Sequence, residues 1–205
     1  MTGNSNTTTT TMSSNREMIL KIVTGGIALA LAFVLSQIKL FELPNGGTVT
    51  PASVLPIIVF AMAFGPSWGF VVAIIFSLLQ LIGGYLLTPF QVLLDYTLGY
   101  ASLGITGFAA MPSAKRVLYR NPLKRFANAG FVKAVIFTII SYIVRWFCSV
   151  LSGVIFYAEY AGDMNPWVYS MIYNGSFLSL DLVFLLIVMA VLYVVLMKAY
   201  KKSSI

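Results

Sequence analysis

The sequence predicts an all-α integral membrane protein with six transmembrane helices and both termini in the cytoplasm. Of its 205 residues, 59% are hydrophobic and only 9% are charged, and the mean hydropathy is +0.91. A soluble domain of this size carries about 25% charged residues. Apolar stretches follow one another from Leu20 to Leu196, and the longer ones can cross about 30 Å of hydrocarbon. Basic residues gather between these stretches, a pattern of membrane orientation rather than of nucleic-acid binding.

The chain divides into a polar tail and one membrane domain. Residues 1–15 are rich in Thr, Ser and Asn and have almost no apolar content, which predicts a disordered tail. Residues 16–202 are expected to form a single six-helix domain. The spans are expected at about Met18–Leu40, Ala52–Phe64, Trp68–Ile82, Phe90–Ala110, Phe131–Phe156 and Trp167–Leu196.

Turn residues and charges separate these spans. A polar loop at 42–51 has two prolines and two glycines, and it ends the first span. A glycine–proline turn at 65–66 separates the second and third spans, and loop 83–89 follows the third. The fourth connection carries five Lys and Arg residues, whereas loop 157–166 carries two acidic ones. Pro56 interrupts the second span, which predicts a helix that is broken or shielded by its neighbours.

The positive-inside rule sets the orientation. Basic residues begin the first span, fill the fourth connection and follow the sixth span, and six crossings place all of them on one side. The opposite loops, at 41–50, 83–89 and 157–166, contain no Lys or Arg. Lys39 is the single exception, and it does not outweigh the rest. Both termini are therefore expected in the cytoplasm.

Several residue types that catalysis commonly uses are missing. The chain has no histidine, Cys148 is its only cysteine, and it has no glycine-rich phosphate loop with its lysine. These absences exclude a histidine-activated nucleophile, an intramolecular disulfide and a multi-thiolate metal site. We therefore expect a protein that is not an enzyme and has no cofactor. Whatever energy it uses must come from a gradient or from a partner.

Three charged residues lie within the spans, where each costs about 2.5–3.5 kcal/mol to insert and is by default a functional hypothesis. Asp95 lies near the outer end of the fourth span, and Arg145 and Asp181 lie near the middle of the fifth and sixth. An ion-pair network that locks helices together would account for them. However, two carboxylates and one guanidinium leave a negative charge unmatched. Either a cationic ligand or a protonated Asp would restore the balance.

Helical spacing places further polar residues beside these charges. One face of the fifth span carries Arg145, Ser149, Ser152 or Gly153, and Phe156 or Tyr157. One face of the sixth carries Trp167, Ser170, Asn174 and Asp181, with only apolar residues in the turn before Asp181. Both faces are expected in the bundle interior, because lipid tolerates polar side chains poorly.

Aromatic side chains crowd the outer ends of the spans. They are Tyr85, Tyr96, Tyr157, Tyr160, Trp167, Tyr169 and Tyr173. An interfacial belt explains more than half of them, and the remainder would form a cage. Aromatic faces beside a carboxylate suit a flat cationic heterocycle, through stacking and cation–π attraction.

Small residues recur at helical spacing on the first span. Gly26 is followed by Ala30, and Ala28 is followed by Ala32 and Ser36. Such stripes let another helix approach closely. Two interpretations stay open: packing inside this protein, and docking of a separate membrane protein.

Three segments together resemble a known family. They run from Leu93 to Tyr96, from Leu151 to Phe156 and from Asn165 to Ser176, and the loop at 45–50 adds to them. In this order and spacing they are similar to the thiamine-specific S components of energy-coupling factor (ECF) transporters, over about residues 20–197. The resemblance implies a subunit of the bacterial cell membrane that binds the vitamin with high affinity at an outward-facing pocket. It would release thiamine inward on joining an ECF module, which has a transmembrane coupling protein and two ATPases.

The resemblance also implies a binding site. By position, Asp95 matches an acidic residue that faces the thiazolium ring, and Arg145 replaces a Lys. The implied ligand-binding set is Asp95, Tyr96, Tyr85, Arg145, Ser149, Gly153, Tyr157, Tyr169 and Asn174, to which the charge pattern adds Asp181. The small residues Gly26, Ala28, Ala30 and Ala32 would dock the partner.

Two of these positions depart from the family. Ser149 stands where the family has His, and Tyr157 stands where it has a stacking Trp; the first outer loop also lacks a Trp that some members have. The departures leave open an S component for another small heterocycle, such as a pyrimidine precursor or a pyridoxine-type vitamin. Two other classes are a proton-coupled carrier with Asp181 as relay, and a membrane enzyme with Asp95 and Asp181 as an acid–base pair.

Overall fold

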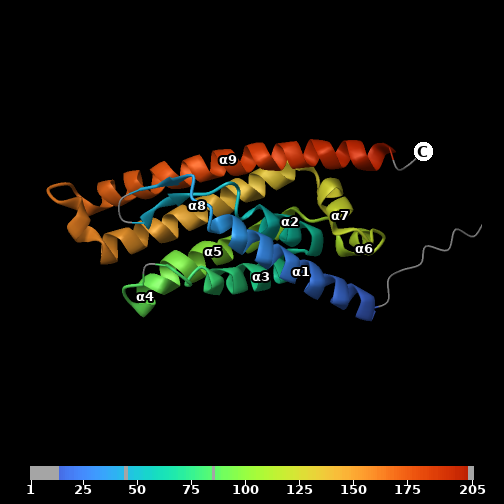
Figure 1. Cartoon of the computed structure of the whole chain (residues 1–205), viewed down its shortest axis with the longest axis horizontal. Helices are drawn as coiled ribbons and strands as arrows, with labels where there is room; N and C mark the ends of the chain where they lie inside the picture. Colours follow the sequence, from blue (N-terminus) through green and yellow to red (C-terminus); the bar gives the residue numbers. More distant parts are fainter. Residues whose placement is uncertain (1–13, 44–45, 85, 203–205) are drawn as a thin grey trace, which may run out of the picture.

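The computed structural model describes residues 14–43, 46–84 and 86–202, and these form a helical bundle (Figure 1). The longer helices are α1 (Ser14–Ser36), α2 (Leu55–Phe64), α3 (Pro66–Leu79), α7 (Pro122–Ala129), α8 (Phe131–Phe156) and α9 (Pro166–Lys202). The shorter ones are α4 (Pro89–Val92), the π-helix η2 (Leu93–Leu98), α5 (Gly99–Ala101), the 3-10 helices η3 (Ser102–Ala109) and η4 (Ala158–Ala161), and α6 (Ser113–Arg116).

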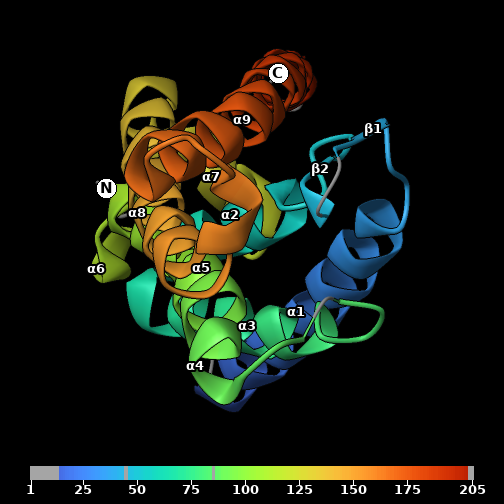
Figure 2. The same cartoon turned by 90° about the vertical axis from the view of Figure 1, so that its left-hand side faces the viewer.

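A short hairpin follows α1. Strands β1 (Phe41–Glu42) and β2 (Thr48–Val49) pair antiparallel, with Phe41 opposite Val49. Figure 2 shows this hairpin between α1 and α9, at the end of the molecule where α4 also lies. We call this end, opposite to α6 and α7 in Figure 1, the hairpin end.

The predicted membrane fold is confirmed in its class. Three helices, at Ser14–Ser36, Phe131–Phe156 and Pro166–Tyr200, are long and apolar enough to cross a membrane, while α2 and α3 are shorter apolar helices. The fourth expected span is a chain of short helices from Pro89 to Ala109. Six crossings, and the sides on which the termini lie, stay predictions.

Two boundaries differ from the sequence prediction. Pro56 does not break a helix, because it lies in the first turn of α2, where the missing N–H would have no intrahelical partner. The other alternative, a helix shielded by its neighbours, agrees with the burial of most α2 residues. Helix α1 begins at Ser14, within the tail expected over residues 1–15, and residues 1–13 lie outside the described part of the chain.

Three basic segments meet at the end opposite the hairpin, which we call the basic end. Arg125 of α7 pairs with Glu17 of α1 through two contacts of 2.6 and 2.7 Å. Lys124 lies 5.1 Å from the centre of the Tyr200 ring near the end of α9. The start of α1, the α6–α7 region and the end of α9 therefore lie together (Figure 1).

Short helices α2 and α3 form the centre of the core. Ile57, Ile58 and Met62 of α2 are fully buried, as is Phe76 of α3. Helix η3 packs closely on α3, because at Gly104 a Cβ atom would lie only 2.8 Å from the Phe70 Cα atom. Helices α8 and α9 pack against each other beside this core.

Candidate functional site

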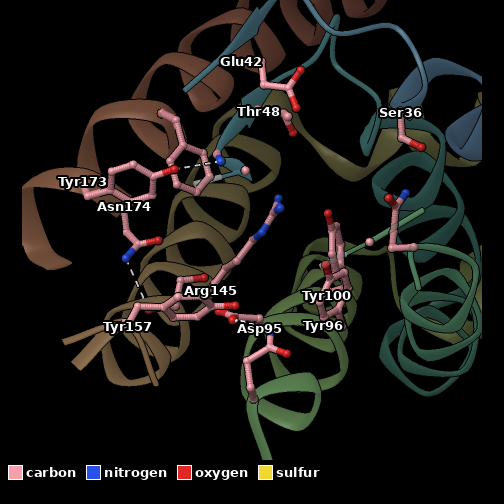
Figure 3. Close-up of a pocket in the computed structure, with 18 of the residues that line it drawn as sticks. Ser36, Glu42, Thr48, Asp95, Tyr96, Tyr100, Arg145, Tyr157, Tyr173 and Asn174 are labelled. Atoms are coloured by element: carbon pink, nitrogen blue, oxygen red, sulfur yellow. Dashed lines mark hydrogen bonds between the residues drawn. The ribbon is translucent and has the colours of Figure 1, made fainter. Parts of the chain in front are cut away.

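A cavity of about 440 Å³ opens at the hairpin end, between the end of α1, the hairpin, the segment after α3, and α4, η2, α5, α8 and α9. Figure 3 shows that its polar side chains converge from these elements. The predicted site residues that line it are Asp95, Tyr96, Arg145, Ser149, Gly153, Tyr157, Tyr169 and Asn174. Tyr85 lies outside the described residues.

Asp95 is held in place by two hydrogen bonds. Its Oδ2 atom accepts from Gln91 Nε2 at 2.9 Å and from the Ser152 hydroxyl at 2.6 Å. Gln91 and Ser152 are both buried, on α4 and α8 respectively. The carboxylate therefore has a defined orientation at the cavity wall, set by two different helices.

The predicted polar face of α8 lines the cavity as expected. Arg145, Ser149, Gly153 and Tyr157 recur every four residues and all border the same space. The Arg145 guanidinium lies over the Tyr100 ring, 4.3 Å from its centre. Among the described residues, Arg145 forms no ion pair within 4.0 Å. A cation–π contact thus takes the place of the ion pair that the sequence left open.

Asn174 connects α9 to α8 at the cavity wall. Its amide nitrogen donates to the backbone oxygens of Ser149 and Ser170 and to the Ser170 hydroxyl, at 3.0–3.3 Å. The amide nitrogen is thereby committed to the protein, and the amide oxygen is the atom that can accept a hydrogen bond from a ligand. Gly153 makes this approach possible, since a Cβ atom there would collide with the Ser170 side chain.

Tyrosine rings form part of the cavity lining, but Trp167 does not. Tyr169 and Tyr173 stack with ring centres 5.8 Å apart and planes inclined by 17°. Tyr157 and Tyr160 form a second, tilted pair. Trp167 was expected on the interior face of its helix, yet it is 45% exposed and lies outside the lining.

The hairpin is attached to the cavity wall through Tyr173. The Gly47 backbone N–H donates to the Tyr173 hydroxyl at 2.8 Å (Figure 3). A Cβ atom at Gly47 would lie 2.8 Å from the Phe177 ring, so only glycine permits this approach without a shift. Gly47 and Thr48 both border the cavity, and the hairpin therefore covers part of it.

Asp181 lies outside the cavity, although the sequence grouped it with the site. It is 5% exposed and accepts hydrogen bonds from the Thr50 N–H at 3.0 Å, the Thr50 hydroxyl at 3.1 Å and the Tyr142 hydroxyl at 2.7 Å. Thr50 follows β2 directly. Asp181 thus connects α8 and α9 to the segment that leaves the hairpin, and it does not share a space with Asp95.

Several lining residues were not singled out by the sequence. Tyr100, Gln91 and Gln80 border the cavity, and Gln80 Nε2 is buried without a hydrogen-bond partner among the described residues. The sequence could have indicated Gln91, since it lies four residues before Asp95 and so on the same helical face. It could not have indicated Gln80, because the position of this residue at the end of α3 follows from the packing of the helices. Lys39 and Glu42 form an exposed 2.7 Å ion pair at the rim.

The structure divides the small residues of α1 into two faces. Ala28 and Ala32 are buried in the core, where their side chains pack within this protein rather than on its surface. Gly26 and Ala30 are exposed on the opposite face, and a Cβ atom at Gly26 would meet nothing within 4 Å. Only this second pair is available to another protein.

These features define a class: an α-helical membrane protein with a polar, tyrosine-lined cavity at one end. A family model described as thiamine transporter protein matches residues 22–201. The chain therefore belongs to the thiamine transporter protein family. This is a family of transport proteins rather than enzymes, which confirms the prediction that the chain is not an enzyme. It is a multi-pass protein of the bacterial cell membrane.

Individual relatives match along nearly the whole chain. The thiamine transporter ThiT of Bacillus subtilis (strain 168) is 25% identical over 198 residues, which cover 94% of this chain and 100% of that protein. The thiamine transporter ThiT of Lacticaseibacillus paracasei (strain ATCC 334) is 30% identical over 197 residues, covering 90% and 91%. A solved structure of ThiT from Listeria monocytogenes has the same fold, with a TM-score of 0.70 at 21% identity, and covers 90% of this chain and 97% of that one.

Proposed function

We propose that this protein is the substrate-binding subunit of an ECF-type vitamin importer and that it binds thiamine in the cavity at the hairpin end. The observation that carries the proposal is the Asp95 carboxylate, oriented by Gln91 and Ser152 beside a tyrosine-lined space. The two curated relatives are both named as thiamine transporters. A fixed carboxylate with aromatic neighbours suits a ring that carries a permanent positive charge, because such a ring cannot become neutral by losing a proton.

The other lining residues would hold the second ring of the ligand. The Asn174 amide oxygen would accept from an exocyclic amino group, because its nitrogen is occupied within the protein. Gln80 Nε2 would donate to a ring nitrogen or hydroxyl. Tyr157 and Tyr169 would stack against the rings. Tyr85 and Tyr96 stay proposed contacts, and Asp181 would hold the hairpin rather than touch the ligand.

In the membrane, six crossings would place the cavity toward the outside and the basic end in the cytoplasm. Thiamine would enter under the hairpin and the loops at 83–89 and 157–166. An ECF coupling protein would then dock on the exposed pair Gly26 and Ala30, where small side chains allow close helix approach. ATP hydrolysis by two partner ATPases would reorient the subunit and release thiamine inward.

A binding titration on the purified protein tests the ligand. Intrinsic Trp and Tyr fluorescence is followed with thiamine, hydroxymethylpyrimidine and pyridoxine. Thiamine should bind most tightly, and Asp95→Asn should weaken it by about 30-fold or more, because the cation loses its buried counter-charge. Asp163→Asn is the matched control, since Asp163 is exposed and lies outside the cavity lining.

The outcomes separate the possible ligands. If the wild-type protein does not bind thiamine but binds another ring compound, that compound replaces thiamine as the proposed ligand. The altered specificity would then be assigned to Ser149 and Tyr157. Equal losses in Asp95→Asn and Asp163→Asn would contradict the proposed role of Asp95.

Co-purification with an ECF module tests the partner. Gly26→Leu and Ala30→Leu should abolish association while thiamine binding to the isolated protein is retained, because both residues face outward. Uptake that persists in cells without any ECF ATPase would instead favour a stand-alone carrier.

A further inference from the structure

A second cavity of about 320 Å³ lies at the basic end, far from the ligand cavity. It is enclosed by the segment after η3, by α6 and α7, and by the first turn of α8. Its polar lining consists of Lys115, Tyr119, Asn128 and Lys133, and Met111 adds an apolar side. The thiamine proposal uses none of these residues.

The charges around this cavity are unbalanced. Residues 110–133 include six Lys and Arg and no Asp or Glu. Of these six, Arg125 is neutralised by Glu17. Lys115 and Lys133 both border the cavity, and within the described ranges neither forms an ion pair. Both side chains are exposed at the cavity, and a bound anion there would be attracted to the two ammonium groups together.

Helix geometry adds to this imbalance. Lys133 lies in the first turn of α8, whose preceding residue Gly130 supplies no side-chain cap. A cation at this end opposes the helix dipole, whereas an anion there is favoured. The Tyr119 hydroxyl offers a further donor, and among the described residues the Asn128 amide donates only to the Lys124 backbone oxygen, at 2.8 Å.

An apolar surface continues from the cavity along the bundle. Phe137 lies four residues after Lys133 on the same face of α8, and its ring is 6.2 Å from that of Phe108. Phe108 is 58% exposed and precedes the cavity-lining segment by two residues. Val132 and Ile136 on α8 are also exposed. Apolar side chains of η3 and α8 therefore begin beside the basic cavity and continue along α8 toward its middle.

We propose that this cavity binds the phosphate group of an anionic phospholipid, with an acyl chain lying along Phe108 and Phe137. Basic pockets between transmembrane helices are known to suit lipid phosphates. A soluble phosphate would use the same lysines but would gain nothing from the apolar side chains of η3 and α8. These side chains are the reason for assigning the site to a lipid.

Lipid retention by the purified full-length protein tests the proposal. Native mass spectrometry measures the affinity for phosphatidylglycerol and for phosphatidylcholine, and the thermal unfolding temperature is recorded with each lipid and with inorganic phosphate. The double variant Lys115→Gln/Lys133→Gln should bind phosphatidylglycerol about 25-fold more weakly, at about fivefold for each lysine. Phosphatidylcholine binding should not change.

The matched control is Arg120→Gln/Lys198→Gln, which removes the same charge from two exposed residues outside the cavity. It should retain phosphatidylglycerol within about twofold of the wild type. An equal loss in both double variants would show a general charge effect and overturn the site. Inorganic phosphate that stabilises the wild type as much as phosphatidylglycerol does would assign the cavity to a soluble anion and overturn the lipid. Unfolding temperatures in phosphatidylcholine alone verify that both variants are folded.

Discussion

The hydroxyl of Tyr142 on α8 donates a 2.7 Å hydrogen bond to the buried carboxylate of Asp181 on α9. Thr50 supplies two further donors to the same carboxylate. Three hydrogen bonds thus compensate a charge that is buried between two long helices. Because Thr50 follows β2, the network also holds the hairpin that covers part of the cavity at the hairpin end.

Removing the Tyr142 hydroxyl should destabilise the protein. Tyr142→Phe leaves the Asp181 carboxylate one donor short at nearly constant volume, which should cost about 1.5–3 kcal/mol. The measurement is thermal unfolding in detergent. Tyr193→Phe is the control, because the Tyr193 ring packs on Phe126 and Phe131 without a hydroxyl hydrogen bond among the described residues. Equal effects of the two variants would show that the hydrogen bond contributes nothing.

The ion pair between Glu17 and Arg125 should contribute strongly to stability. Arg125 is fully buried, and its Nε also donates to the Tyr119 backbone oxygen at 2.8 Å. Glu17→Gln leaves this guanidinium without its counter-charge, which should cost about 3–5 kcal/mol of unfolding free energy.

The control for this pair is Glu42→Gln. The Lys39–Glu42 pair is about half exposed, with side-chain exposures of 49% and 53%. Its loss should change the unfolding free energy by at most about 1 kcal/mol. Similar effects of Glu17→Gln and Glu42→Gln would contradict the structural role of Arg125.

Loss of the Ser152 hydroxyl should weaken thiamine binding. Ser152→Ala removes the 2.6 Å donor that orients Asp95, and a tenfold lower affinity is expected if about 1.4 kcal/mol of charged hydrogen bonding is lost. Isothermal titration calorimetry measures the dissociation constant. Ser179→Ala, an exposed serine on α9, should bind like the wild type. An unchanged affinity in Ser152→Ala would mean that Gln91 alone orients the carboxylate.

A methyl group at Gly153 should disturb the cavity wall. Gly153→Ala would push the Ser170 side chain, whose hydroxyl accepts from Asn174, and would widen the contact between α8 and α9. Overpacking of this kind costs about 1–3 kcal/mol, and thiamine affinity should fall by about tenfold or more. Gly175→Ala on α9 is the control, since its Cβ atom would meet only Trp146 at an ordinary 3.5 Å. Normal thiamine binding by Gly153→Ala would contradict the need for close approach.

Helical spacing predicted much of the site because it depends on the backbone alone. Residues four apart on one helix share a face whatever lies opposite, so the sequence alone predicts a common face for Arg145, Ser149, Gly153 and Tyr157. Asp95 and Asn174 stood out for a related reason, since polar side chains in apolar helices need partners. In the structure all of these positions border one cavity.

The same reasoning could not place Asp181 or Arg125. Asp181 falls near the face of Asn174, yet its donors come from Thr50 and Tyr142, which approach from other elements. The sequence does not distinguish Arg125 from the other basic residues of its loop. Only the position of Glu17 on α1 explains why Arg125 is buried. A single sequence contains no information about which distant residue will supply a partner.

The sequence by itself determined the membrane character, the absence of the common catalytic groups and the faces on which polar residues gather, because composition and periodicity are local properties. Only the tertiary structure decided that Ala28 and Ala32 face the core while Gly26 and Ala30 face outward, and that Asp95 lines the cavity while Asp181 supports the hairpin. The physical reason is that burial and hydrogen bonding between helices depend on their relative positions. Those positions follow from the packing of all helices together and from no single one of them.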